Sequence, residues 1–162
     1  QHLPVVVVGD KPDPKNVLIG FDGSDNAFKA VDCACSLMPK SGRKVMLCHV
    51  AQRINNFLGD KKILSEDQEK TLIAQSRQQV RDLMQDAASR LEEAGFDHDL
   101  IAQEILEGKV SRAVAIAKTA EMEGYGTIVT GRRGLSVIKD FLMGRVRVKV
   151  LHRAYEMAGW IV

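Results

Sequence analysis

Short apolar runs alternate with amphipathic segments along almost the whole chain, and this alternation limits the fold more than any other feature. The run at 17–21 is rich in β-branched residues and lies between turn residues, as is typical of a buried strand. Similar runs predict further strands at 44–50, 98–106, 127–130 and 160–162. Strands that alternate with helices need crossover connections, so we expect an α/β fold with a mostly parallel sheet and helices on both faces.

The segments between these runs have helical spacing and recognisable ends. Ser24 or Asp25 can cap the first helix, which stops at Pro39. After a polar loop, Ser65 and Gln68 form a capping box that opens a long second helix. The second, third and fourth helices are predicted at 65–94, 110–122 and 145–155. On the second helix we expect an apolar face made of Leu72, Val80, Leu83, Met84, Ala87, Ala88 and Leu91.

The amino-terminal residues predict a division of the chain. Residues 1–8 read as a strand with no helix before it, and 9–15 read as a proline-containing linker. We interpret 1–8 as the remnant of a preceding α/β domain and 16–162 as the domain that follows it. Val5–Val8 is expected to pair with Trp160–Val162, because such an apolar edge strand would otherwise stay open.

Length and composition exclude several classes of protein. The chain has 162 residues and a net charge of +2, which fits one domain and gives no sign of nucleic-acid binding. No apolar run is long enough to span a membrane, and the start does not resemble a signal peptide, so a cytoplasmic location is expected. Cys33, Cys35 and Cys48 lack redox or zinc spacing, and we interpret them as small reduced core residues.

Two turns that follow strands are candidate ligand sites, because ligands of such sheets bind outside the carboxyl ends of the strands. Asp22, Gly23 and Ser24 follow the strand at 17–21, and a glycine-rich turn at 131–134 follows the strand at 127–130. Asp22 could bind ribose or magnesium, or cap the helix that follows. His49 is expected to be a packed or backbone-bonded histidine.

Glycines are spaced through the second turn in a pattern that suits an anion. Gly131 and Gly134 are followed, after nine residues, by Gly144 at the start of a predicted helix. Glycines let backbone amides approach a phosphate, and a helix start adds free donors and partial positive charge. The pattern is neither a Walker A loop nor a dinucleotide fingerprint, and taken alone it also fits glycines with only a structural purpose.

The glycine spacing and the residues around it resemble those of the universal stress protein family. Similar stretches are the run from Val17 to Ser24, His49-Val50, Gly131–Ser136, Phe141–Gly144 and Lys149–Ala154. The resemblance extends from about Asn16 to Val162. It implies five parallel strands in the order 3-2-1-4-5, association through the last strand, and a stress-response role.

The resemblance also implies a nucleotide site at the point where the strand order reverses. The residues it places there are Asp22, Gly23, Ser24, Val50, Thr130, Gly131, Arg133, Gly134, Gly144, Arg145, Val146 and Arg147. Of these, Asp22 and Val50 would lie on the adenine and ribose side. The glycines would wrap the phosphates of ATP, ADP or AMP, with or without magnesium.

Arg145 and Arg147 depart from the family motif, which has small hydroxyl residues at these places. Arginines at a helix start face the positive end of the helix dipole, and a bound phosphate would relieve that repulsion. They either hold phosphate or block it. We therefore expect a nucleotide-binding regulatory domain that works through dimerisation or partner binding and is not an enzyme beyond slow ATP hydrolysis. The alternative is a nucleotide-free dimerising interaction protein.

Overall fold

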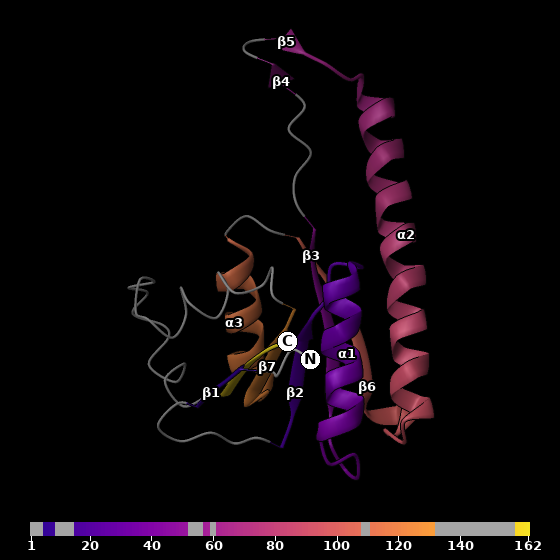
Figure 1. Cartoon of the computed structure of the whole chain (residues 1–162). Coiled ribbons are helices and arrows are strands. Elements are labelled where there is room, and N and C mark those ends of the chain that lie inside the picture. Colours follow the sequence, from indigo (N-terminus) through magenta and orange to yellow (C-terminus); the bar gives the residue numbers. More distant parts are fainter. Residues whose placement is uncertain (1–4, 9–14, 52–56, 59–60, 108–110, 132–157) are drawn as a thin grey trace.

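The structure is a computed structural model that describes residues 5–8, 15–51, 57–58, 61–107, 111–131 and 158–162. It contains a six-stranded sheet with the order β1-β8-β7-β2-β3-β6 (Figure 1). These strands are β1 (Val5–Val8), β2 (Val17–Gly20), β3 (Val45–Ala51), β6 (Ile101–Glu107), β7 (Thr127–Thr130) and β8 (Ala158–Ile161). Five of these strands, which lie side by side in the order β6-β3-β2-β7-β8, are parallel. In chain order they are the third, second, first, fourth and fifth parallel strands. The expected order 3-2-1-4-5 is therefore confirmed.

Two short stretches differ from the sequence-based expectation. His98–Leu100 forms a 3-10 turn and not the start of a strand, because the Asp97 side chain accepts a hydrogen bond from the Asp99 backbone and bends the chain there. The stretch expected to be only a polar loop contains a small antiparallel hairpin, β4 (Phe57–Leu58) with β5 (Lys61–Lys62). Neither difference changes the order of the parallel strands.

In the described part of the chain three helices connect the parallel strands, and the first two begin at their predicted caps. They are α1 (Asp25–Leu37), α2 (Glu66–Glu93) and α3 (Arg112–Glu123). The Ser24 side chain caps α1. Both hydrogen bonds of the capping box are present between Ser65 and Gln68 at the start of α2. The fourth predicted helix, 145–155, lies outside the described residues.

The core divides into two layers, one on each face of the sheet. Helices α1 and α2 cover one face, and α3 covers the other (Figure 1). Side chains alternate between these layers along β2: Val17 and Ile19 pack under α1 and α2, while Leu18 packs under α3. The third helix buries Ala113, Ile116, Ala117 and Ala120 against the sheet, and Val114 is only half-buried.

Only the second half of α2 packs on the sheet. Its buried residues are Met84, Ala87, Ala88 and Leu91, and Figure 1 shows its first half extending past the strands toward the β4–β5 hairpin. The inclusion of Leu72 in the buried face was wrong, because its side chain is 43% exposed on the extending half. Helical spacing predicted the face of the helix but not where the sheet ends.

The amino-terminal strand lies where we expected it. β1 pairs antiparallel with β8, with Val6 opposite Trp160 and Val8 opposite Ala158. This confirms the predicted pairing of Val5–Val8 with the carboxy-terminal strand, although β8 begins two residues earlier than the predicted 160–162.

Within the described residues no helix is long and apolar enough to cross a membrane. The three cysteines are free thiols; Cys33 and Cys48 are buried and Cys35 is half-buried, so the expectation of reduced core residues holds for two of them and in part for the third. Burial raises the pKa of the Cys48 thiol to about 12, so this residue is protonated and unreactive at neutral pH.

Candidate functional site

The strand order reverses between β2 and β7, and the candidate site lies at their carboxyl ends. The connections from β2 and β3 run through α1 and α2 on one face, whereas the connection from β6 to β7 runs through α3 on the other. In sheets of this class, ligands bind outside the carboxyl ends of the strands where the order reverses, so the ends of β2 and β7 are the place to look for a ligand.

The loop after β2 is held in one conformation by its own hydrogen bonds. The Asp22 carboxylate accepts a hydrogen bond from the Ser24 backbone N–H at 3.0 Å, and Ser24 then caps α1 by accepting from the Ala27 N–H. Gly23 has φ +77°, and a Cβ there would stand 2.7 Å from Leu83 Cδ1. The positive φ is what requires glycine in this turn, whereas the Leu83 side chain could move aside for a Cβ.

The Asp22 carboxylate is exposed and carries a negative charge at neutral pH. Partial burial by itself raises the pKa of Asp22, but hydrogen bonds from Ser24 and the positive charge of Arg112 outweigh it and lower that pKa. Asp22 is not the helix cap that was one of its two expected roles, because Ser24 caps α1 and Asp22 instead closes the turn before it. Its charge also stays available to a ribose hydroxyl or a cation.

Three positions face α3 at the carboxyl ends of neighbouring strands, namely Gly20 on β2, Val50 on β3 and Thr130 on β7. Val50 is 6% exposed and offers an apolar surface. Thr130 is 3% exposed, and its hydroxyl has no hydrogen-bond partner among the described residues. Such a buried hydroxyl is costly without a partner, so it marks a place where a ligand atom would be stabilising.

Gly131 follows β7 and lies directly against the first turn of α1. A Cβ at this position would stand 2.6 Å from the Asn26 carbonyl carbon, and backbone at that distance cannot move aside cheaply. The first glycine of the predicted phosphate loop is therefore required by close approach between two backbones, and this approach brings the start of that loop beside the Asp22 turn.

The described structure brings together half of the predicted site residues. Asp22, Gly23 and Ser24 form one turn, and Val50, Thr130 and Gly131 lie at the neighbouring strand ends. The other six predicted residues lie outside the described residues: Arg133, Gly134, Gly144, Arg145, Val146 and Arg147.

Sequence reasoning missed two residues at this place. Gly20 ends β2 without a side chain, and a Cβ there would stand 3.1 Å from Thr130 Cγ2; a glycine at the end of an apolar strand was a signal for it. Arg112, in the first turn of α3, acts electrostatically on Asp22. No sequence signal connected Arg112 to the site, because the crossover of α3 alone brings it there.

His49 has the expected structural role. Its Nδ1 lies 2.9 Å from the carbonyl oxygen of Phe21, between the ends of β3 and β2. Among the described residues, no cluster of three or more histidine, cysteine or acidic side chains could hold a metal ion.

The sheet order defines an α/β protein of the doubly wound class. The sequence matches the model of the universal stress protein family over residues 14–155. The chain therefore belongs to the universal stress protein family.

Solved structures show the same fold. A universal stress protein family member from Burkholderia pseudomallei has 22% identity and a TM-score of 0.65, with 82% of this chain and 91% of that chain covered. A universal stress protein in complex with cAMP has 24% identity and a TM-score of 0.54, with 91% and 95% covered. A family protein from Arabidopsis thaliana with AMP bound has 16% identity and a TM-score of 0.53, with 83% and 87% covered. No curated protein matches the chain.

Proposed function

We propose that this protein is a regulatory domain that binds an adenine nucleotide at the carboxyl ends of β2, β3 and β7. The observation that carries the proposal is the buried Thr130 hydroxyl, which has no partner among the described residues and lies beside Gly131 and near the Asp22 turn. Two family members of the same fold were solved with cAMP and with AMP, which supports an adenine nucleotide as the ligand class.

In this proposal each part of the site recognises a different part of the ligand. Val50 gives the base an apolar surface, and Asp22 accepts a hydrogen bond from the ribose or holds magnesium through its charge. Gly131, Gly134 and Gly144 let backbone amides approach the phosphates of ATP, ADP or AMP. Arg133, Arg145 and Arg147 add positive charge, and Val146 lies between the last two in sequence.

The proposed output is regulation of association and not chemistry. We propose at most slow hydrolysis, because the sequence shows no evident general base together with a placed lysine and metal ligands. Dimerisation or partner binding through the last strand would carry the signal. We also propose that residues 1–8 are the end of a preceding domain of a tandem protein, linked by 9–15 to the domain at 16–162.

The test is nucleotide binding measured by calorimetry in the parent protein and in Gly134→Val. We expect ATP to bind the parent protein and not the variant, because a branched side chain would occupy the phosphate path. Undiminished affinity in Gly134→Val would contradict the assigned position of the phosphates. The folded state of the variant is checked by circular dichroism.

The second candidate is a nucleotide-free interaction protein, and arginine at 145 and 147 favours it. Absence of heat with ATP, together with no nucleotide in mass spectra of freshly purified protein, would support this candidate. Changing both arginines to serine separates the readings: weaker ATP binding means that they hold phosphate, and stronger binding means that they block it.

A further inference from the structure

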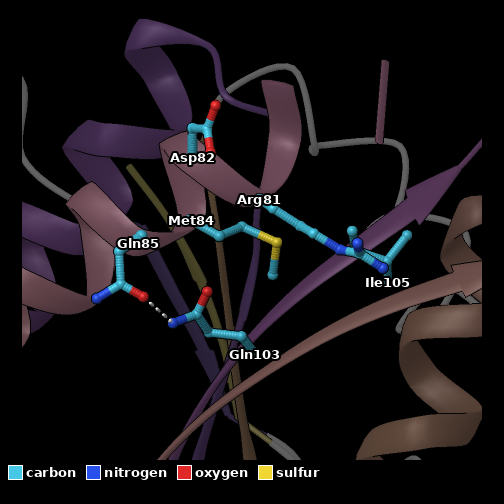
Figure 2. Close-up of a pocket in the computed structure, with 6 residues that line it drawn as sticks. All are labelled: Arg81, Asp82, Met84, Gln85, Gln103 and Ile105. Carbon is cyan, nitrogen blue, oxygen red and sulfur yellow. Dashed lines mark hydrogen bonds between the residues drawn. The ribbon is translucent and has the colours of Figure 1, made fainter. Parts of the chain in front are cut away.

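A groove of about 530 Å³ runs between α2 and β6, away from the candidate nucleotide site (Figure 2). Ile101 and Ile105 of β6 belong to the core layer under α1 and α2, whereas Ala102 and Leu106 face α3. The groove therefore lies on the opposite face of the sheet from Val50 and Thr130. Its lining residues are Arg81, Asp82, Met84, Gln85, Gln103 and Ile105.

The groove has an apolar floor and a polar bridge at one end. Met84 is 1% exposed and points between the helix and the strand, beside the half-buried Ile105 (Figure 2). The Gln103 side-chain amide donates to Gln85 Oε1 at 3.3 Å, which connects β6 with α2. Both glutamine side chains keep further donor and acceptor capacity for a ligand.

One cation that lines the groove has no partner among the described residues. Arg81 is exposed, makes no hydrogen bond or ion pair with any described residue, and extends toward Ile105 in Figure 2. Arg77, one turn earlier, pairs with Glu107, but its Nε is buried without a partner in the described structure. The neighbouring Asp82 accepts from Gln78 at 2.9 Å and points away from Arg81. A carboxylate entering the groove would pair with Arg81.

β6 is the outermost strand among the described residues, and one edge of its backbone is free of pairing there. One edge pairs with β3 along all seven residues, and the other edge pairs with no described strand. An open edge beside a groove suits an extended peptide, which pairs its backbone with the strand and places alternate side chains in the groove.

A second copy of this chain is a poor occupant of that edge. Antiparallel pairing of two β6 strands about their midpoint would set Glu104 directly against Glu104 of the other copy. Like charges directly opposite each other destabilise a strand pair. The charge on the strand thus discourages self-association, while Arg81 attracts an acidic partner.

We propose that the edge of β6 and the α2 groove bind an extended, acidic segment of a partner protein, which adds a strand to the sheet and pairs a carboxylate with Arg81. This interaction surface is separate from the nucleotide site and does not depend on the function proposed for that site.

The probe is a fluorescent eight-residue peptide in which valine alternates with glutamate, and fluorescence anisotropy with the whole chain measures its binding. We expect Arg81→Gln to weaken binding about tenfold, the effect of losing one charge-assisted hydrogen bond. The matched control is Lys118→Gln, an exposed cation on α3, which should change binding by less than about twofold.

Two further peptides test the mode of binding. The glutamine version should bind the parent protein about as weakly as the glutamate peptide binds Arg81→Gln, and a version with alternate N-methylated amides should not bind, because strand pairing needs those N–H groups. The proposal is overturned if the glutamate peptide does not bind at millimolar concentration, if Arg81→Gln binds it as well as the parent does, or if N-methylation has no effect.

Discussion

At the scale of single residues, the candidate site contains polar side chains that lack a hydrogen-bond partner or keep an exposed charge in the described structure. Thr130 buries a hydroxyl without a partner in the described structure, and Asp22 keeps an exposed charge although it accepts a hydrogen bond from Ser24. Buried polar groups in a stable core normally have partners. A residue that departs from this rule at a strand end is therefore a candidate for ligand contact.

Thr130→Val tests that reasoning, because valine has the shape of threonine without its hydroxyl. We expect the free energy of unfolding of the nucleotide-free protein to rise by about 1 kcal/mol, since an unsatisfied buried hydroxyl is removed. ATP affinity should fall at the same time. Urea unfolding and calorimetry measure the two quantities. A variant that loses stability would show that the hydroxyl has a structural partner.

A second prediction at this scale concerns His98, which lies 2.9 Å from Glu92. Its hydrogen bond to Glu92 and the charge of that carboxylate raise the pKa of His98 above its ordinary value of 6.5. The pKa of His98 is therefore higher in the folded protein than in the unfolded chain. The pair stabilises the folded protein fully at a pH below the unfolded pKa, and this stabilisation is lost as the pH rises through the folded pKa.

Glu92→Gln should lower the pKa of His98 in an NMR titration, because a neutral amide no longer favours the imidazolium form. Glu93→Gln is the control: Glu93 is the next residue on the helix and has no contact with His98 in the described structure. An unchanged pKa of His98 in Glu92→Gln would contradict the assigned cause.

At the scale of elements, α2 combines two different halves in one continuous helix. Its second half buries Leu91 and Met84 against the sheet, whereas its first half is held by a capping box and extends past the strands. The ion pair between Arg77 and Glu107 lies near the boundary between these halves. We therefore expect side chains of the same type to contribute very differently to the free energy of unfolding in the two halves of this helix.

Alanine substitution of one leucine in each half of α2 tests this difference. Leu91→Ala should cost about 2–5 kcal/mol, because Leu91 is 0% exposed and its removal leaves a cavity. Leu72→Ala should cost less than about 0.5 kcal/mol, because Leu72 is already 43% exposed. Chemical unfolding gives both values. Comparable losses would mean that another surface covers the first half of the helix in solution.

At the scale of the whole molecule, the sheet has two very different ends. At one end β1 covers β8, and at the other β6 is open beside the groove of α2. An uncovered apolar strand is prone to pair with another chain. The antiparallel β1 therefore removes from β8 an edge that would otherwise be available for association.

Deletion of residues 1–8 should expose β8 and cause concentration-dependent self-association, seen by analytical ultracentrifugation. Amide exchange at Ala158–Ile161 should become faster in the dilute variant, because these residues lose their partners in β1. Deletion of 1–4 alone is the control, since it leaves Val5–Val8 in place. A monomeric variant with unchanged protection would contradict this role of β1.

The strands of the parallel sheet, the caps of α1 and α2 and the strand order were predictable from the amino-acid sequence, the last through family resemblance. Apolar spacing reports which face of a segment is buried, and caps such as Ser24 and Ser65 act on residues within one turn. The turn at Asp22 was predictable for the same reason, because its hydrogen bonds are made within three residues.

Only the tertiary structure decided what lies opposite these segments. The close approach of Gly131 to Asn26, the charge of Arg112 near Asp22 and the groove between Arg81 and Ile105 each join residues far apart in the chain. The exposure of Leu72 likewise depends on where the sheet ends beneath α2. Local pattern determines the elements and their faces, whereas contacts between elements depend on crossover geometry and packing, which no short stretch of sequence contains.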